Sequence, residues 1–218
     1  MPRKREDPQP APARERAYRL QRLDPWRERD ACGVGFVARA DGARRHDVLQ
    51  MGLTAVSRLA HRGAASNDKS GDGAGVLTQI PHRLLGVGPV ERVALGMFFL
   101  PQQRTDEAID LIEGALVSLG MSVLGWRVVP VNPGVLGPLA ATSQPVIRQL
   151  FVGPPTGDAD AQRWERRLYV ARRVIERRAI AAGIELFVCS LSCRSVVYKA
   201  LLVGTELAGF YADLKSPL

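Results

Sequence analysis

Cys32 is the residue of this sequence best suited to covalent chemistry. It opens the string Cys32-Gly33-Val34-Gly35-Phe36, where a charged, Pro-rich leader gives way to regular apolar patterning. If the chain is cut before Cys32, its thiol and a new α-amino group lie on one residue. A free α-amine has a pKa of about 7.7–8.0, so it can accept a proton near neutral pH and activate the thiol as a nucleophile. The alternative is a small buried side chain at the start of a strand, the usual role of a free cysteine.

Two further stretches carry residues that could line a site. His61-Arg62-Gly63 follows an expected helix, with Gly63 as its C-cap and His61 as a packing or hydrogen-bonding residue. The run from Gly71 to Gly75 has three glycines in five residues, with Asp72 between two of them, which is typical of tight turns and close backbone approach. This loop lacks the Gly-Lys-Ser/Thr ending of a P-loop and leads into an expected strand. A site wall is therefore favoured, and a nucleotide-binding loop is the alternative.

The elements that must position these residues alternate between strands and helices. Thr105 is the expected N-cap of the second helix, residues 132–145 are expected to be a loop, and residues 184–203 resemble a β-hairpin. Residues 209–218 show no element that would close the domain. The pattern predicts an α+β fold with at least one mixed or antiparallel sheet. Strands are expected at 33–39, 76–80, 93–100, 122–131, 146–152, 184–191 and 195–203, and helices at 44–60, 105–119 and 161–182.

Composition narrows the class of protein. The net charge of +8 is compatible with a nucleic-acid partner, but nearly all of the positive charges are arginines. The few aromatic residues are not interleaved with the basic ones. The sequence thus lacks a base-stacking platform, and no nucleic acid is expected. No apolar run reaches the roughly 18 residues of a membrane span, and no secretory signal is present. We expect a cytoplasmic protein without a membrane partner.

The other two cysteines, Cys189 and Cys193, do not form a zinc pair. Their spacing is unusual and no histidine lies near them in the sequence. We expect both to be reduced thiols in the core, and we expect no metal site in the chain.

Several strings together resemble the glutamine amidotransferase domain of the glutamate synthase large subunit. These are ACGVGF, AHRGA, NDKSGDGAGVLTQIP, VALGMFFLP, LGWRVVPVN, SQPVIRQLFV, RRLYVARRVIE and FVCSLSCRSVVYKALL. The resemblance implies an N-terminal-nucleophile hydrolase fold, an αββα sandwich. Prolines and charges of both signs predict that residues 1–31 are a disordered leader, either a propeptide or a frayed tail. The resemblance implies that this leader is removed and that Cys32 attacks the amide of L-glutamine to release ammonia. By resemblance, Arg62, Gly63, Asp72 and Gly73 lie near the Cys32 pocket, where they either contact glutamine or support the pocket floor.

The resemblance also predicts that residues 32–218 form about the first half of such a domain. Motifs like H-x-R-F-S-T-N and H-N-G-E-I-N, which grip glutamine and build the oxyanion hole, are expected beyond Leu218. The chain by itself is therefore expected to be inactive. FMN and an iron–sulfur cluster are expected in the remainder of the large subunit, and no cofactor is expected in this chain. The expected partners of this chain are that remainder and the small subunit. The alternative is a non-catalytic half-domain that binds or regulates another chain through apolar edges in the strands of 184–203.

Overall fold

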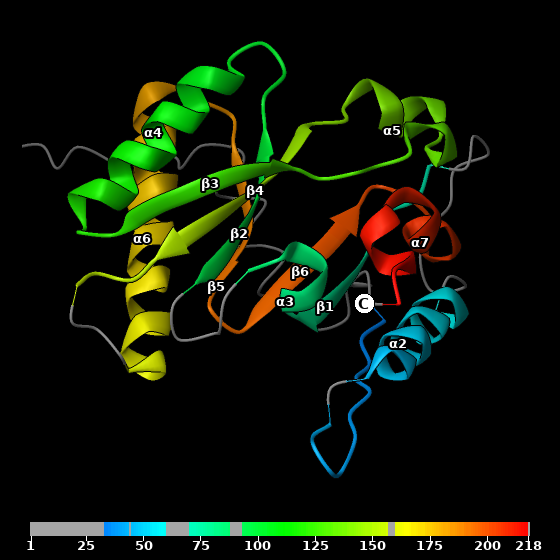
Figure 1. The fold of residues 1–218 in the computed structure, drawn as a ribbon. Coiled ribbons are helices and arrows are strands. Elements are labelled where there is room, and N and C mark those ends of the chain that lie inside the picture. The colour runs from blue at the N-terminus through cyan, green and yellow to red at the C-terminus, as the bar shows by residue number, and fades with distance from the viewer. Residues whose placement is uncertain (1–32, 44, 60–69, 88–92, 157–159, 218) are drawn as a thin grey trace, which may run out of the picture. The chain divides into compact units, whose positions relative to one another are not determined.

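The computed structural model describes residues 33–43, 45–59, 70–87, 93–156 and 160–217, and Figure 1 shows its ribbon. Helices and antiparallel strands both build it, which confirms the predicted α+β class. Its elements are α2 (His46–Arg58), β1 (Ala74–Gln79), α3 (His82–Leu85), β2 (Ala94–Leu100), α4 (Thr105–Ser118), β3 (Ser122–Val128), η2 (Pro133–Val135), α5 (Pro138–Thr142), β4 (Val146–Gly153), α6 (Ala161–Ala182), β5 (Phe187–Ser192), β6 (Ser195–Ala200), η3 (Gly204–Glu206), α7 (Leu207–Phe210) and η4 (Ala212–Lys215).

The larger sheet has four antiparallel strands in the spatial order β3-β4-β2-β5. β2 is an inner strand whose two faces are both buried: Leu95 and Met97 on one side and Phe98 on the other have no exposed area. This double burial explains why residues 93–100 form a continuous apolar run instead of an alternating one. The pairing of β2 with β5 shifts its register between Met97 and Phe98.

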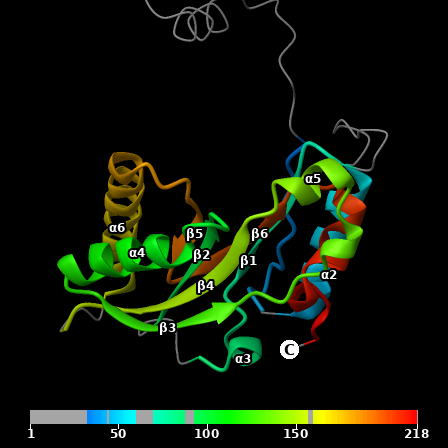
Figure 2. The same ribbon diagram turned by 90° about the horizontal axis from the view of Figure 1, so that it is seen from above.

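Helices α4 and α6 cover one face of this sheet, and Figures 1 and 2 show them side by side. α6 has the predicted bounds: the Asp160 carboxylate accepts the Gln162 amide at 2.8 Å, and Gly183 ends the helix in the left-handed conformation with φ of 60°. Its inward stripe follows helical spacing, which brings the apolar side chains to one face and leaves most arginines in solvent. The buried stripe consists of Trp164, Leu168, Ala171, Ile175 and Ala179.

The smaller sheet consists of β1 and β6, which pair antiparallel with Val76 opposite Tyr198. A second core joins this sheet to the other face of the four-stranded sheet and to α2 and α7. Burial of apolar side chains in both cores is the main stabilising contribution to this arrangement. The fully or nearly buried members of the second core include Leu53, Met97, Tyr198, Phe210 and Tyr211.

The predicted hairpin over residues 184–203 is wrong. β5 pairs with β2 in the larger sheet, whereas β6 pairs with β1 in the smaller one. The residues between them, Cys193 and Arg194, form a corner that carries the chain from one sheet to the other. Adjacent strands in sequence usually pair with each other, but a strand that changes sheets at a corner has no local signature.

The strand predicted at 33–39 is also absent. These residues have no ladder partners among the described residues, and Val34 and Phe36 are 90% and 94% exposed. Alternating apolar residues favour a strand only where another strand lies alongside to satisfy the backbone groups. Here the two ends of the segment contact α2 and its C-cap instead: Gly33 lies against Leu59, and Arg39 Nη1 lies 3.9 Å from the Asp47 carboxylate.

Two local predictions need correction as well. Thr105 is the first residue of α4 and not its N-cap, because its hydroxyl donates to the Pro101 carbonyl at 2.7 Å and does not accept a backbone N–H. The expected loop at 132–145 contains the short helices η2 and α5, each with a proline in its first turn. Proline is tolerated there because the first amides of a helix lack intrahelical acceptors anyway.

The prediction that residues 209–218 lack a closing element is wrong. α7 and η4 pack this end of the chain into the second core, where Phe210 and Tyr211 are almost fully buried. The Tyr211 hydroxyl donates to the Lys199 carbonyl at 2.7 Å, which fastens the segment to β6. Short helical turns without a long periodic pattern escape detection in the sequence.

A buried polar network completes this attachment. Arg127 of β3 makes a bidentate ion pair with Asp213, its Nη1 and Nη2 lying 2.8 and 2.7 Å from the two carboxylate oxygens. The Tyr198 hydroxyl donates to the same carboxylate at 3.0 Å, and Gln149 accepts from Arg127 at 2.7 Å. The hydrogen bonds that Arg127 donates to Asp213 raise the pKa of its guanidinium, so Arg127 stays charged. The network thereby joins β3, β4, β6 and η4, which are far apart in the sequence.

Candidate active site

Asp72 and Gly73 are the predicted site residues that the structure describes. Cys32, Arg62 and Gly63, like the leader 1–31, lie outside the described residues. The nearest described residues are Gly33, which follows Cys32, and Leu59, which precedes Arg62 by three positions.

Gly33, the residue after Cys32, lies against the C-terminal end of α2. A Cβ added at Gly33 would lie 3.1 Å from Leu59 Cδ2 and 3.3 Å from Cδ1, so only a very small residue fits without displacing Leu59. Leu59 is the C-cap residue of α2, three positions before Arg62. The structure therefore joins the neighbour of Cys32 to the end of the helix that leads into His61-Arg62-Gly63.

The loop that contains Asp72 and Gly73 is built by close backbone approach, as predicted from its glycines. A Cβ at Gly71 would lie 2.7 Å from the backbone carbonyl of Leu202, and one at Gly75 would lie 2.7 Å from Lys199 Cβ. Gly73 has φ of 119°, a conformation that other residues rarely adopt. At the start of the loop, the buried Ser70 hydroxyl accepts the amide of Ala140 at 3.2 Å. The loop is thus tightly fixed.

This loop forms one wall of an open groove of about 590 Å³. Phe99 of β2, Phe187 of β5 and Lys199 of β6 also line this groove. Lys199 Nζ lies 4.1 Å from the centre of the Phe187 ring, a cation–π contact that leaves the ammonium at the groove. The groove thus combines an apolar floor with one cationic and one anionic side chain, Lys199 and Asp72.

A second groove of about 680 Å³ continues from the first toward α6, and the two share Leu77 and Val197. Several of its apolar side chains are exposed: Leu77 at 66% and Tyr169 at 65%. Together the two grooves form a continuous apolar face over β1, β6 and α6, which we call the open face.

The two described cysteines are core thiols, as predicted. The Cys193 thiol donates to a Glu165 carboxylate oxygen at 3.1 Å, and the Cys189 thiol to the Val197 carbonyl at 3.5 Å. Burial raises the pKa of Cys189 to about 11, and burial with the adjacent Glu165 raises the pKa of Cys193 to about 12. Both remain protonated at neutral pH, so neither is an activated nucleophile.

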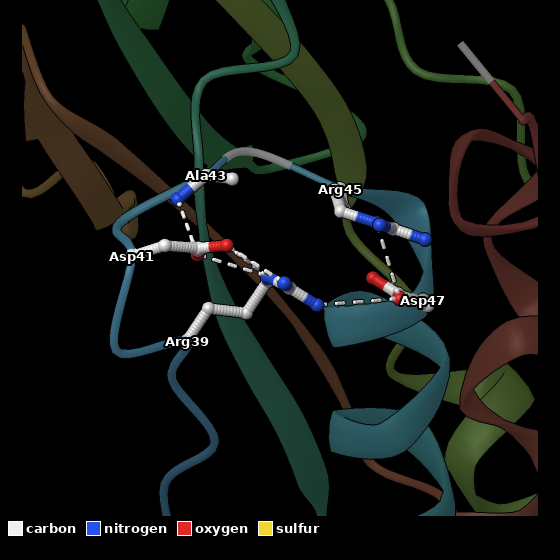
Figure 3. Close-up of polar contacts among 5 residues, drawn as sticks. All are labelled: Arg39, Asp41, Ala43, Arg45 and Asp47. Atoms are coloured by element: carbon white, nitrogen blue, oxygen red, sulfur yellow. Dashed lines mark hydrogen bonds and ion pairs between the residues drawn. The ribbon is translucent and has the colours of Figure 1, made fainter.

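One charged cluster, at residues 39–47, is not among the residues that the sequence predicted for a site. Arg39, Asp41, Arg45 and Asp47 meet where the segment after Cys32 turns into α2, and Figure 3 shows their contacts. The order Arg-x-Asp-Gly at residues 39–42 is a turn signal that could have indicated it. Its partner Asp47 could not have been assigned from sequence.

Within the described residues, no group of three or more His, Cys, Asp and Glu side chains could hold a metal ion. In the same residues, none of the helices combines the length and the apolar character that crossing a membrane requires.

Comparisons with known proteins agree with the resemblance read from the sequence. The chain is 42% identical over 207 residues to the ferredoxin-dependent glutamate synthase 2 of Synechocystis sp. and 38% identical over 201 residues to the glutamate synthase [NADPH] large chain of Bacillus subtilis. It is 40% identical over 206 residues to the ferredoxin-dependent glutamate synthase 1, chloroplastic/mitochondrial, of Arabidopsis thaliana. Each alignment covers 88% of this chain but 13% of the relative, so the chain spans about an eighth of these proteins. A family model described as glutamine amidotransferases class-II matches residues 32–218, and the chain therefore belongs to the class-II glutamine amidotransferases.

Proposed function

We propose that this chain carries the nucleophile of the glutaminase reaction of a glutamate synthase. The observation that carries the proposal is the match of the class-II amidotransferase family from Cys32 onward, with Gly33 packed against the helix that leads into Arg62. The similarity to three glutamate synthases supports the choice of that enzyme among the amidotransferases.

In the proposed reaction, removal of residues 1–31 exposes the α-amine of Cys32. The amine takes the thiol proton while sulfur attacks the glutamine side-chain carbonyl. The C–N bond then breaks, the same proton goes to the leaving nitrogen, and ammonia departs. Water cleaves the γ-glutamyl thioester that remains, giving glutamate and restoring the thiol. Arg62, Gly63, Asp72 and Gly73 contact glutamine or support the pocket floor.

We further propose that the released ammonia reacts with 2-oxoglutarate elsewhere in the enzyme. FMN and an iron–sulfur cluster would bind in the remainder of the large subunit, which together with the small subunit is the proposed partner. The proposed location is the cytoplasm. This chain holds no cofactor in the proposal.

The open face supports the proposal that residues 32–218 are about half of an αββα domain. A two-stranded sheet has little independent stability, and β1–β6 leaves Leu77 exposed on the face turned away from α2. Further strands of the same domain would cover this face and bring the residues that grip glutamine. On this view the chain is inactive alone, because loss of even one oxyanion donor typically costs 10²–10³ in rate.

The open face also favours one alternative, a non-catalytic half-domain that binds another chain. Phe187 in β5 and Leu201 after β6 are 44% and 54% exposed, at the place where that alternative predicts apolar edges. Exposed apolar patches of this kind mark protein–protein contacts. The two proposals differ in whether Cys32 reacts.

The test is the intact mass of the protein purified from its own host, with and without 6-diazo-5-oxo-norleucine, a glutamine analogue that alkylates such cysteines. The proposal expects a polypeptide that begins at Cys32 and gains one label, which Cys32→Ser abolishes. Cys32→Ser should also end glutamine-dependent synthesis while ammonia-dependent synthesis continues. An unlabelled polypeptide that retains residues 1–31 would favour the binding module, and equal loss of both activities would make Cys32 structural.

A further inference from the structure

Helix α4 carries a row of exposed residues on the side turned away from the larger sheet. The row recurs at helical spacing and lies opposite Ile112, which is fully buried against the sheet. We call this row the α4 stripe, and it consists of Asp106, Asp110, Gly114 and Val117.

Helix α6 carries a corresponding row beside it. This row is also exposed and lies opposite Leu168, which is fully buried. The α6 stripe consists of Arg166, Val170, Arg173, Arg177 and Ile180. Figures 1 and 2 show the two helices side by side, and Arg178 donates to the Ser118 hydroxyl at 2.9 Å where their flanks meet. Both stripes therefore face the same side of the helical layer.

The two helices carry opposite charge. α4 contains four carboxylates and no basic residue, whereas α6 contains seven arginines and two glutamates. Arg172 and Arg173 pair with Glu176 within α6, and no ion pair joins α4 to α6 in the part of the chain that the structure describes. The opposite charges of the two stripes thus do not neutralise each other through direct pairs.

Each stripe also exposes apolar side chains between its charges. Ile180 is 80% exposed, Val117 is 62% exposed and Val170 is 51% exposed. The outward side of a surface helix is usually polar, and apolar groups surrounded by charge mark contacts with another protein. At Gly114 an added Cβ would have no atom within 4 Å, so α4 is accessible to a neighbouring side chain at this position.

A second copy of the chain fits this surface best. Because an acidic and a basic stripe lie side by side, a two-fold rotation places each stripe against the stripe of opposite charge on the other copy. Such a contact is isologous, the commonest kind in homo-oligomers, and it uses every complementary pair twice. A purely acidic partner or a nucleic acid would match the α6 stripe but would be repelled by the α4 stripe.

We infer that the outer side of the α4–α6 layer is the interface of a homodimer, in which the α4 stripe of each protomer meets the α6 stripe of its partner. The exposed aliphatic side chains are buried in this contact, and the charges of the stripes fix its orientation. The inference does not depend on the proposed role of Cys32.

The test is sedimentation equilibrium of the native polypeptide purified from its own host, over a range of protein concentrations. We expect a dimer whose Kd rises between about 0.1 M and about 1 M NaCl, because salt screens exposed charges. Asp110→Arg and Arg177→Glu should each raise the Kd about ten-fold, since a symmetric interface contains every substitution twice. An equal mixture of these two variants should form a heterodimer with a Kd close to that of the wild type. In that heterodimer one contact between opposite charges is unchanged and the other is reversed.

Arg83→Glu is the matched control, because it makes the same change in charge as Arg177→Glu. Arg83 is exposed on α3, which Figures 1 and 2 show apart from α4 and α6. This variant should leave the Kd at the wild-type value. A monomer at every concentration would overturn the inference, as would an association that Asp110→Arg and Arg177→Glu leave unchanged. A mixture of the two variants that associates no more tightly than either variant alone would also contradict it.

Discussion

Removal of the charge on Asp213 should destabilise this protein more than any surface substitution. Asp213 is 4% exposed and holds both terminal nitrogens of Arg127, which is 25% exposed, together with the hydroxyl of Tyr198. Asp213→Asn keeps the size and shape of the side chain. It replaces one acceptor oxygen with an amide that faces cationic donors.

The magnitude follows from the burial of the two partners. Breaking a buried ion pair by removing one member costs about 3–5 kcal/mol, because the remaining charge stays desolvated. Arg127 is only partly buried and can recover some hydration, so we expect a loss of about 2–3 kcal/mol in the free energy of unfolding. For a chain of this size that corresponds to a fall of roughly 4–12 °C in the unfolding midpoint.

Urea unfolding of a double-mutant cycle measures the pair directly. The cycle comprises Asp213→Asn, Arg127→Met and the double variant, with a coupling energy of about 1.5–3 kcal/mol expected. The exposed Arg104–Glu107 pair is the comparator, and its cycle should show no coupling beyond error. A coupling below about 0.5 kcal/mol for Arg127 and Asp213 would refute the view that this network fastens the C-terminal segment.

Two further predictions follow from the packing and the thiols. Gly204→Ala should lower the free energy of unfolding by about 1–3 kcal/mol, because the added Cβ would lie 2.7 Å from the backbone carbonyl oxygen of Val56. Gly114→Ala on α4 should raise it by about 0.5–1 kcal/mol, because a Cβ there has no atom within 4 Å and alanine favours the helix. Equal urea midpoints for the two variants would contradict this. With pKa values raised from 9.0 to about 11 and about 12, Cys189 and Cys193 should resist iodoacetamide at pH 8 until the protein unfolds, since about one thiol in a thousand or fewer is ionised. Because these pKa values are higher in the folded state than in the unfolded state, the unfolded chain loses its thiol protons first as the pH rises. The free energy of unfolding should therefore fall between about pH 9 and pH 12.

The regular elements could be predicted from the sequence because their signals are local. The α6 stripe from Trp164 to Ala179, the Asp160 cap and the Gly183 terminus lie within one continuous stretch, and the predicted bounds agree with the structure. The apolar run of β2 was equally clear, because an inner strand is buried on both faces. Local propensity and tertiary packing favour the same structure at these positions.

The rest depended on contacts between residues distant in sequence. Nothing near β5 and β6 indicates that they belong to different sheets, since each is paired with a strand about a hundred residues earlier. The alternation of residues 33–39 predicted a strand, yet the segment pairs with no strand among the described residues, and its ends contact Leu59 and Asp47. The Arg127–Asp213 pair likewise joins residues 86 positions apart. Such pairings leave no periodic pattern.

The structure describes two of the three cysteines in the sequence, Cys189 and Cys193. A nucleophilic thiol must reach its substrate and lose its proton near neutral pH. Cys189 and Cys193 both fail the second requirement, because burial favours their neutral form. Cys193 also fails the first, because it has no exposed area, whereas Cys189 is 8% exposed and lines the groove beside α6. Cys32 is thus the remaining candidate for the proposed nucleophile among the three cysteines of the sequence, and it lies outside the described residues.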